Sequence, residues 1–316
     1  MLSLSFNKTG TSPTHCLQYG VKVLGTFGLI LQTFCIAAFE VADPSTLLSA
    51  TSQGRGGATI ASSQFQDALF QNPASAVFSN RYALNASYLG WGNSLAASIV
   101  DTQSGPVGGG VYYVRRDLST IDSQSSALGN YARNEEHMGF ALMGKLSDQV
   151  GIGTNVRYVY RKSDVAGIGN ASAWNFDVGL KFLPQRQFAI GIVGHNLMTD
   201  KIGIFPKRIS GGVDYLAMPN FSISGQIFKV DGSNLPSQFT LPVSDAGIGY
   251  AIGGEYVLPY SIALRSGYSV NPSWNQKLLS FGAGYVVPKF SIDYAMQLGV
   301  SGSKENVHTV SVTGFF

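Results

Sequence analysis

Alternation between large apolar residues and small or polar residues runs through most of this chain and is most regular between Ile248 and Val270. In the first half of this stretch, Ile248, Tyr250 and Ile252 alternate with glycine and alanine. Every second side chain of a strand shares a face, whereas a helix repeats every 3.6 residues, so this period predicts a β-strand. Pro259 then precedes a second alternating run. Since proline lacks the N–H that a ladder position donates, it indicates the turn of an antiparallel hairpin.

Similar hairpins recur along the chain, each with a proline near its turn. They occupy 174–196 around Pro184, 211–228 around Pro219 and 281–298 around Pro288. The connections expected at the opposite ends are longer and more polar: Asp117–Glu136, Asp164–Ala171, Asp200–Lys207, Asp231–Gly247, Asn271–Lys277 and Gly299–Val307. Short turns at one end and long loops at the other are typical of an outer-membrane barrel.

The alternating segments after residue 80 number fourteen. They are predicted to begin near Arg81, Leu95, Val107, His137, Gly151, Ala171, Phe188, Arg208, Phe221, Ile248, Tyr260, Lys277, Lys289 and Val307. An even number suits a single-chain barrel. The predicted fold is all-β: a transmembrane antiparallel β-barrel of about 14 strands with an N-terminal plug segment. A soluble sandwich or propeller is the alternative. It would not explain together the loop asymmetry, the terminal Phe316 and the apolar segment near the N-terminus that is described next.

The first 42 residues differ from the rest and are predicted to be a signal peptide. Val23–Ala38 is an uncharged apolar run, too short for a membrane-spanning helix of about 20 residues. Both cysteines, Cys16 and Cys35, lie in this leader. The mature chain would therefore have no disulfide and no thiolate metal site. Without another long apolar run, the chain can span a membrane only as strands of a closed barrel.

Residues 43–80 form a separate segment without strand alternation, and 81–316 form the predicted barrel. Gln64–Phe70 is expected to be a short helix that ends at Asn72-Pro73-Ala74, because proline disfavours helix at the preceding residue. The segment is too rich in apolar residues for a disordered tail. A barrel lumen would give these side chains a surface to pack on, so the segment is predicted to be a plug.

Parity also predicts which residues face the lumen. Trp174 and Phe176 should face lipid, whereas Asn175 should face inward, because a charge on the lipid face costs about 2–4 kcal/mol at the midplane. The strand charges expected in the lumen are Arg81, Arg157, Arg161, Asp177, Lys181, Asp214, Glu255, Arg265 and Asp293. Their mixed signs favour internal ion pairs over a charge-selective pore.

Composition argues against several classes of function. Charged residues make up 12% of the chain and the net charge is +3, without a basic run, so no nucleic-acid partner is expected. The histidines are His15, His137, His195 and His308. His195-Asn196 could serve a lipase, but no nucleophile–base spacing supports an enzyme. No metal-ligand spacing is visible, and no cofactor is expected.

Two parts of the chain together resemble the FadL-like outer-membrane protein superfamily. GRGGATIASSQFQDALFQNPASA (Gly54–Ala76), directly before the first strand, resembles the plug segment of that superfamily, with its Gly-rich start and Asn-Pro-Ala motif. Ala251–Ser269 and Phe205–Tyr215 resemble its shorter PorV-like branch. The plug or gate residues that this resemblance implies are Gly54, Arg55, Gly56, Gly57, Asn72, Pro73 and Ala74.

The resemblance implies a place in the outer membrane of a Gram-negative-type bacterium, in contact with its lipid. It also implies uptake of hydrophobic small molecules through a plugged lumen, with lateral exit through the wall. The loops here are modest and lack the apolar platform of the long-chain fatty-acid transporters. The PorV-like likeness implies an alternative, in which the barrel assists protein secretion or surface attachment and has a secreted-protein partner.

Overall fold

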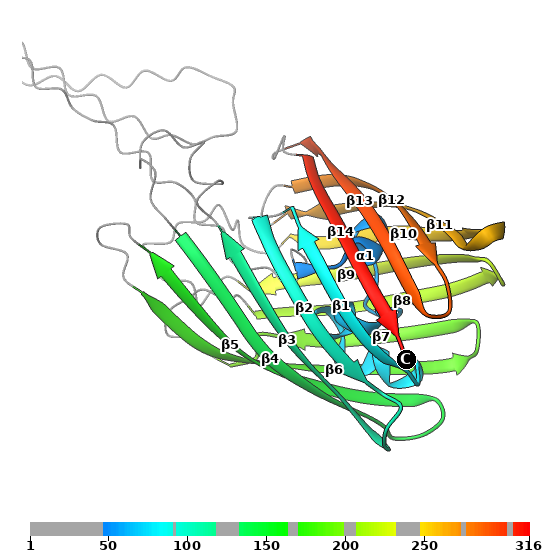
Figure 1. Ribbon diagram of the computed structural model, residues 1–316, viewed down its shortest axis with the longest axis horizontal. Coiled ribbons are helices and arrows are strands. Elements are labelled where there is room, and N and C mark those ends of the chain that lie inside the picture. The colour runs from blue at the N-terminus through cyan, green and yellow to red at the C-terminus, as the bar shows by residue number, and fades with distance from the viewer. Residues whose placement is uncertain are drawn as a thin grey trace, which may run out of the picture.

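The chain forms a closed barrel of fourteen antiparallel strands (Figure 1), as the alternation predicts. The computed structural model describes residues 47–90, 93–117, 133–163, 170–198, 207–231, 247–272, 276–301 and 306–316. Each strand pairs with its neighbours in sequence, and β1 closes the barrel against β14. The predicted signal peptide lies outside the described residues.

The strands begin close to the predicted positions. Their bounds are β1 Tyr82–Leu89, β2 Ser94–Asp101, β3 Val107–Asp117, β4 Arg133–Lys145, β5 Val150–Ser163, β6 Ala171–Gln185, β7 Phe188–His195, β8 Lys207–Met218, β9 Phe221–Asp231, β10 Ile248–Leu258, β11 Ile262–Asn271, β12 Gln276–Val286, β13 Phe290–Ser301 and β14 Asn306–Phe315. Before them come the short helices α1 Ala50–Gly54, α2 Phe65–Gln71 and η2 Pro73–Phe78, and η4 Pro259–Ser261 lies in a turn. No helix in the described ranges is long and apolar enough to cross a membrane.

The connections differ between the two ends of the barrel. At the end that holds the β2–β3, β4–β5, β6–β7, β8–β9, β10–β11 and β12–β13 turns, two to five residues separate the strands, and we call this the short-turn end. At the opposite, long-connection end, four to sixteen residues separate them. The predicted loop Asp117–Glu136 was too wide, because β4 already begins at Arg133 and its polar residues continue the strand.

Pro184 also departs from its predicted place in a turn. It lies in the last part of β6, where the register with β7 shifts between Phe182 and Gln185. A bulge tolerates a residue that cannot donate to the ladder, so the proline sits beside the turn.

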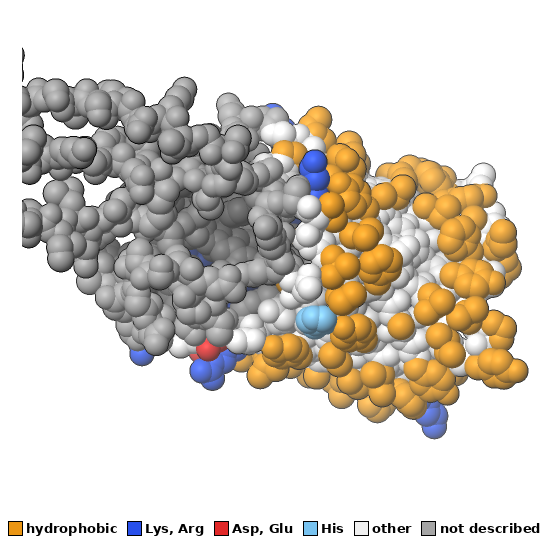
Figure 2. Space-filling view, turned by 90° about the horizontal axis from the view of Figure 1, so that it is seen from above, with side chains coloured by type: hydrophobic (Ala, Val, Ile, Leu, Met, Phe, Trp, Pro, Cys, Tyr) orange, Lys and Arg blue, Asp and Glu red, His pale blue; other side chains and the backbone are white. Residues whose placement is uncertain are grey.

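Side chains of β6 alternate between the two faces of the wall as the sequence predicts. Adjacent residues of β6 separate sharply, with Trp174 58% exposed and Asn175 fully buried. Inward positions of β6 include Asp177 and Lys181, while Leu180 points outward. Figure 2 shows hydrophobic side chains covering much of the outer face in view, with few charges among them. This apolar exterior fits the transmembrane barrel that the sequence predicts.

Residues 47–80, which we call the inner segment, lie within the barrel. Figure 1 shows α1 in blue behind the front strands. Helix α1 contacts β11–β14, α2 contacts β1–β3, and η2 contacts β4–β6. Its apolar residues form a core with inward side chains of the wall; the members include Leu47, Leu69, Phe70, Val100, Tyr112 and Met143. Helix α2 covers nearly the range predicted for it.

Candidate functional site in the lumen

The Asn72-Pro73-Ala74 turn joins the inner segment to the wall at β6. Asn72 Nδ2 donates to Ile60 O and to Leu180 O, both at 3.0 Å, and its Oδ1 accepts from Ala74 N at 3.1 Å. Asn72 is fully buried. One side chain therefore ties together two parts of the inner segment and the backbone of β6.

Glycines of the wall make room for this turn. A Cβ at Gly153 of β5 would lie 2.5 Å from Ala74 N, and one at Gly179 of β6 would overlap Asn72 Oδ1. Because glycine has no side chain, the backbone of the inner segment can lie directly on the sheet. The position of the turn thus depends on small residues far away in the sequence.

The Gly54–Gly57 loop meets the opposite part of the wall. Gly56 and Gly57 have φ of 66° and 75°, a conformation that favours glycine. Side chains at Gly253 and Gly267, which are paired across β10 and β11, would collide with the backbone of Arg55. The backbone of the loop therefore contacts the backbone of β10 and β11 directly, without side chains between them.

The Arg55 side chain anchors this loop to β8. Its Nη2 lies 2.5 Å from Asp214 Oδ1, and the guanidinium is nearly buried. Charge-assisted hydrogen bonds of this kind are stronger than neutral ones. Further contacts to the wall run from Ala50 N to Ser311 Oγ at 2.9 Å and from Lys181 Nζ to Ser75 O at 3.3 Å.

A buried carboxylate connects α1 and α2 within the inner segment. Asp67 accepts from Ser49 N at 2.7 Å, and from the hydroxyls of Ser49 and Ser52 at 2.6 Å each. Burial raises the pKa of Asp67 above its ordinary value, and the three donors oppose that rise. The hydrogen bonds that connect α1 and α2 therefore depend on whether Asp67 is protonated.

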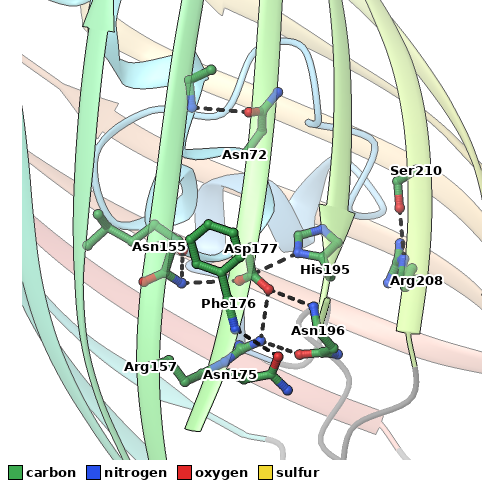
Figure 3. Close-up of polar contacts among 12 residues, drawn as sticks. Asn72, Asn155, Arg157, Asn175, Phe176, Asp177, His195, Asn196, Arg208 and Ser210 are labelled. Atoms are coloured by element: carbon green, nitrogen blue, oxygen red, sulfur yellow. Dashed lines mark hydrogen bonds and ion pairs between the residues drawn. The ribbon is translucent and has the colours of Figure 1, made fainter. Parts of the chain in front are cut away.

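A polar network lies in the lumen toward the long-connection end (Figure 3). Arg157 Nη2 donates to Asn196 Oδ1 at 2.5 Å and to Asp177 Oδ1 at 3.3 Å. Asp177 also accepts from Asn196 N at 2.8 Å and from Asn155 Nδ2 at 3.2 Å, and His195 Nδ1 lies 3.7 Å from its Oδ2. The network joins β5, β6 and the end of β7.

A second network gathers around Glu135 of β4. Its carboxylate accepts from Arg161 Nε at 2.9 Å, lies 2.6 Å from His137 Nε2 and 3.4 Å from Arg116 Nη1. Glu135 and His137 are fully buried and Arg116 nearly so. Arg116 and Glu135 were missed as lumen residues. Parity with the buried Tyr112 and Val114 could have found Arg116, whereas Glu135 was assigned to a loop.

The predicted lumen charges fall into three groups. Arg157, Arg161, Asp177, Lys181, Arg265 and Asp293 are buried. Asp214 and Glu255 are part-exposed and paired with arginines, and Arg265 also holds Asp293, with Nη1 2.6 Å from Oδ1. Arg81 departs from the predicted place in the lumen: it precedes β1, where strand alternation no longer fixes its face, and it is exposed, with its guanidinium 5.4 Å from the centre of the Phe315 ring.

A cavity of about 410 Å³, with both polar and apolar side chains in its lining, separates the inner segment from the short-turn end. It is lined by the inner segment and by inward residues of the wall, among them Ser63, Gln66, Glu255 and Asp293. Among the residues that the structure describes, Ser63 Oγ and Gln66 Nε2 find no hydrogen-bond partner. This chamber therefore suits water or a polar molecule, because buried polar groups need hydrogen bonds.

His195, the histidine considered for a lipase, is fully buried beside Asp177 and Arg157 (Figure 3). It belongs to the polar network of β5, β6 and β7. Within the part of the chain that the structure describes, no group of three or more His, Cys, Asp or Glu is placed to hold a metal ion.

Comparison with known proteins finds likeness at the level of the fold. No protein-family model matches the chain, and no curated protein matches it. Among solved structures, a CymD monoaromatic hydrocarbon channel is similar at TM-score 0.64 and 14% identity, over 87% of this chain and 99% of that one.

Two further solved structures have TM-scores and identities close to these values. The toluene transporter TodX of P. putida has TM-score 0.61 and 13% identity, over 86% of this chain and 99% of that one. A Pseudomonas aeruginosa FadL homologue has TM-score 0.59 and 13% identity, over 85% and 98%. The fourteen-stranded barrel is thus a fold that this chain shares with channels.

Proposed function

We propose that this protein is a FadL-like outer-membrane channel of a Gram-negative-type bacterium for the uptake of hydrophobic small molecules. One observation carries the proposal: a closed barrel with an apolar exterior holds residues 47–80 within its lumen. A general pore needs an open lumen, whereas a channel for apolar cargo needs a barrier to ions. The printed names of the similar structures, hydrocarbon channels and toluene transporters, support the same function.

The inner segment is the plug in this proposal, and its anchors set the barrier. Asn72 ties it to β6 and Arg55 ties it to β8, so it is held on two sides of the lumen. The glycines beneath both anchors let the backbone seal against the wall without intervening side chains. Ions would have to pass a layer of buried side chains, which is costly.

Lateral exit is the proposed way out for the cargo. The chamber on the short-turn side mixes apolar side chains such as Phe65 and Phe315 with hydroxyl, amide and charged groups, so an apolar molecule that entered it would have to bury polar groups away from water. The ladder between β6 and β7 begins only at Val178 and Gly194, and Leu197 N then bonds to Phe176 O. No described residue of β7 pairs with Ala171–Asn175, which supports an exit between β6 and β7 near the long-connection end.

Uptake by whole cells tests this proposal. Cells of a Gram-negative bacterium without their own channel for hydrophobic compounds would express the chain or a variant lacking 43–74. Labelled naphthalene and sucrose serve as the apolar and polar solutes. We expect the intact protein to speed the entry of naphthalene alone, and the deletion variant to admit both. If the intact protein, present at equal amounts in the outer membrane, does not raise naphthalene entry above the empty vector, the proposal is wrong.

A further inference from the structure

A hollow of about 580 Å³ lies on the outer wall of the barrel, over β9–β12; we call it the outer hollow. Its floor is the ladder pair Gly254 and Ser266. Both residues face outward, and neither carries a large side chain. Ile223 of β9 and Phe281 of β12 are their next ladder partners, and they stand on either side of the floor. Three strand spacings separate these flanking residues, about 14 Å.

The rim of the outer hollow is aromatic. Phe221, Tyr256, Tyr268 and Phe281 line it, and the rings of Phe221 and Tyr256 lie 6.3 Å apart in an edge-to-face arrangement. Glu255 and Arg265 also border the hollow, but they stand at inward positions, where Arg265 Nε lies 2.5 Å from Glu255 Oε2. The surface offered to an occupant therefore consists of rings, aliphatic side chains, backbone and the hydroxyl of Ser266.

The floor is held in shape from the inside. Gly253 and Gly267, the inward neighbours of the floor residues, pack directly on the backbone of Arg55 and Gly56. The inner segment thus backs a wall that has no side chains on its inner face at this point. The backbone contact with the inner segment fixes the position of the floor in the folded wall.

These features select the chemistry of the occupant. Within a membrane, lipid chains are as apolar as the wall, so the hydrophobic effect favours no apolar occupant over another. Contacts between rings do distinguish an aromatic molecule from a lipid chain, because the edge of an aromatic ring is attracted to the faces of the surrounding rings. We propose that the outer hollow binds a flat, uncharged aromatic molecule taken from the membrane. The inference rests on the proposed place of the barrel in a membrane and does not require that the protein transports anything.

Photolabelling in lipid nanodiscs tests this site separately from uptake. Benzophenone, an uncharged aromatic photoprobe, is irradiated with the intact protein, and labelled peptides are identified by mass spectrometry. We expect labelling to concentrate on Phe221–Phe281. Excess benzene, whose triplet state lies above that of benzophenone and therefore does not quench the probe, should lower it about tenfold. An equal concentration of decane should leave it unchanged, because only benzene reproduces the ring contacts.

Variants make the test specific. Ser266→Leu fills the floor and should lower the labelling about tenfold. Ala97→Leu, at an outward position of β2, adds the same side chain elsewhere and should leave it unchanged. Should Ser266→Leu fail to show the heat-modifiable migration of an assembled barrel, Phe281→Leu removes one ring of the rim instead and should lower labelling about threefold.

Three results would each overturn the proposal. Labels spread evenly around the barrel would mean that there is no site. Equal competition by decane would mean that the outer hollow holds an acyl chain. An assembled Ser266→Leu or Phe281→Leu variant that labels as the intact protein does would place the site elsewhere. Failure of uptake with labelling intact would overturn only the transport function.

Discussion

Replacing Asn72 by alanine should loosen the inner segment from the wall. The side chain makes three hydrogen bonds, to Ile60 O, Leu180 O and Ala74 N, in a fully buried place. Each contributes about 1 kcal/mol net, and only the bond to Leu180 O reaches the wall, so its loss weakens docking by about 1 kcal/mol. A shift of that size raises the population of the undocked segment about fivefold.

Two measurements report this change. In nanodiscs, the amide hydrogen exchange rates of residues 60–75 should rise by up to the same factor relative to the intact protein, since exchange follows local opening. In planar bilayers, brief ion-conducting events should become correspondingly more frequent. The barrel itself should still assemble, because the lost bonds involve only one wall carbonyl, that of Leu180.

Asn85→Ala is the matched control. Asn85 is also a buried asparagine, but its Nδ2 donates to Thr313 Oγ1 at 2.7 Å, within the β1–β14 seam. Its loss should affect the stability of the wall and leave conductance at the level of the intact protein. Equal exchange and conductance in the Asn72→Ala and Asn85→Ala variants would refute the reasoning that Asn72 holds the inner segment.

Further predictions concern the plug, the lipid face and the charged groups. Deleting 43–74 should leave an assembled barrel whose ion conductance in planar bilayers is well above that of the intact protein; unchanged conductance would mean that the lumen is blocked by something else. Ile292→Arg places a charge at a position that is 50% exposed on the outer face and should cost about 2–4 kcal/mol in assembly, measured by heat-modifiable migration with Ile292→Ala as control. Glu135→Gln leaves its buried cationic partners without their carboxylate and should lower stability to urea by about 3 kcal/mol. Since the folded pKa of Asp67 is raised, the stability it contributes is fully present below its unfolded pKa of about 3.9 and is lost as pH rises through the folded value. The protection factor of residues 47–71, which corrects the exchange rate for the intrinsic effect of pH, should therefore fall with rising pH in the intact protein and lose that dependence in Asp67→Asn.

The sequence by itself determined the strands and their faces. A period of two is a local property of a few consecutive residues, so the number of strands and the inward place of Asp177 could be read without the fold. The same holds for α2, whose end is set by the proline that follows it. The errors arose where local patterns weaken: Glu135 lies beside a long polar connection, and Pro184 lies at a bulge rather than in a turn.

Only the tertiary structure decided which residues meet across the lumen. Arg55 and Asp214 are 159 residues apart, and nothing in either neighbourhood indicates the pairing. The glycines under the inner segment look like ordinary small inward residues until the fold places a backbone against them. The outer hollow likewise exists because the registers of four neighbouring strands set Ile223 and Phe281 on either side of Gly254 and Ser266. Alternation specifies the face of each residue, whereas the stagger of the closed sheet specifies its neighbours, and that stagger is a property of all fourteen strands together.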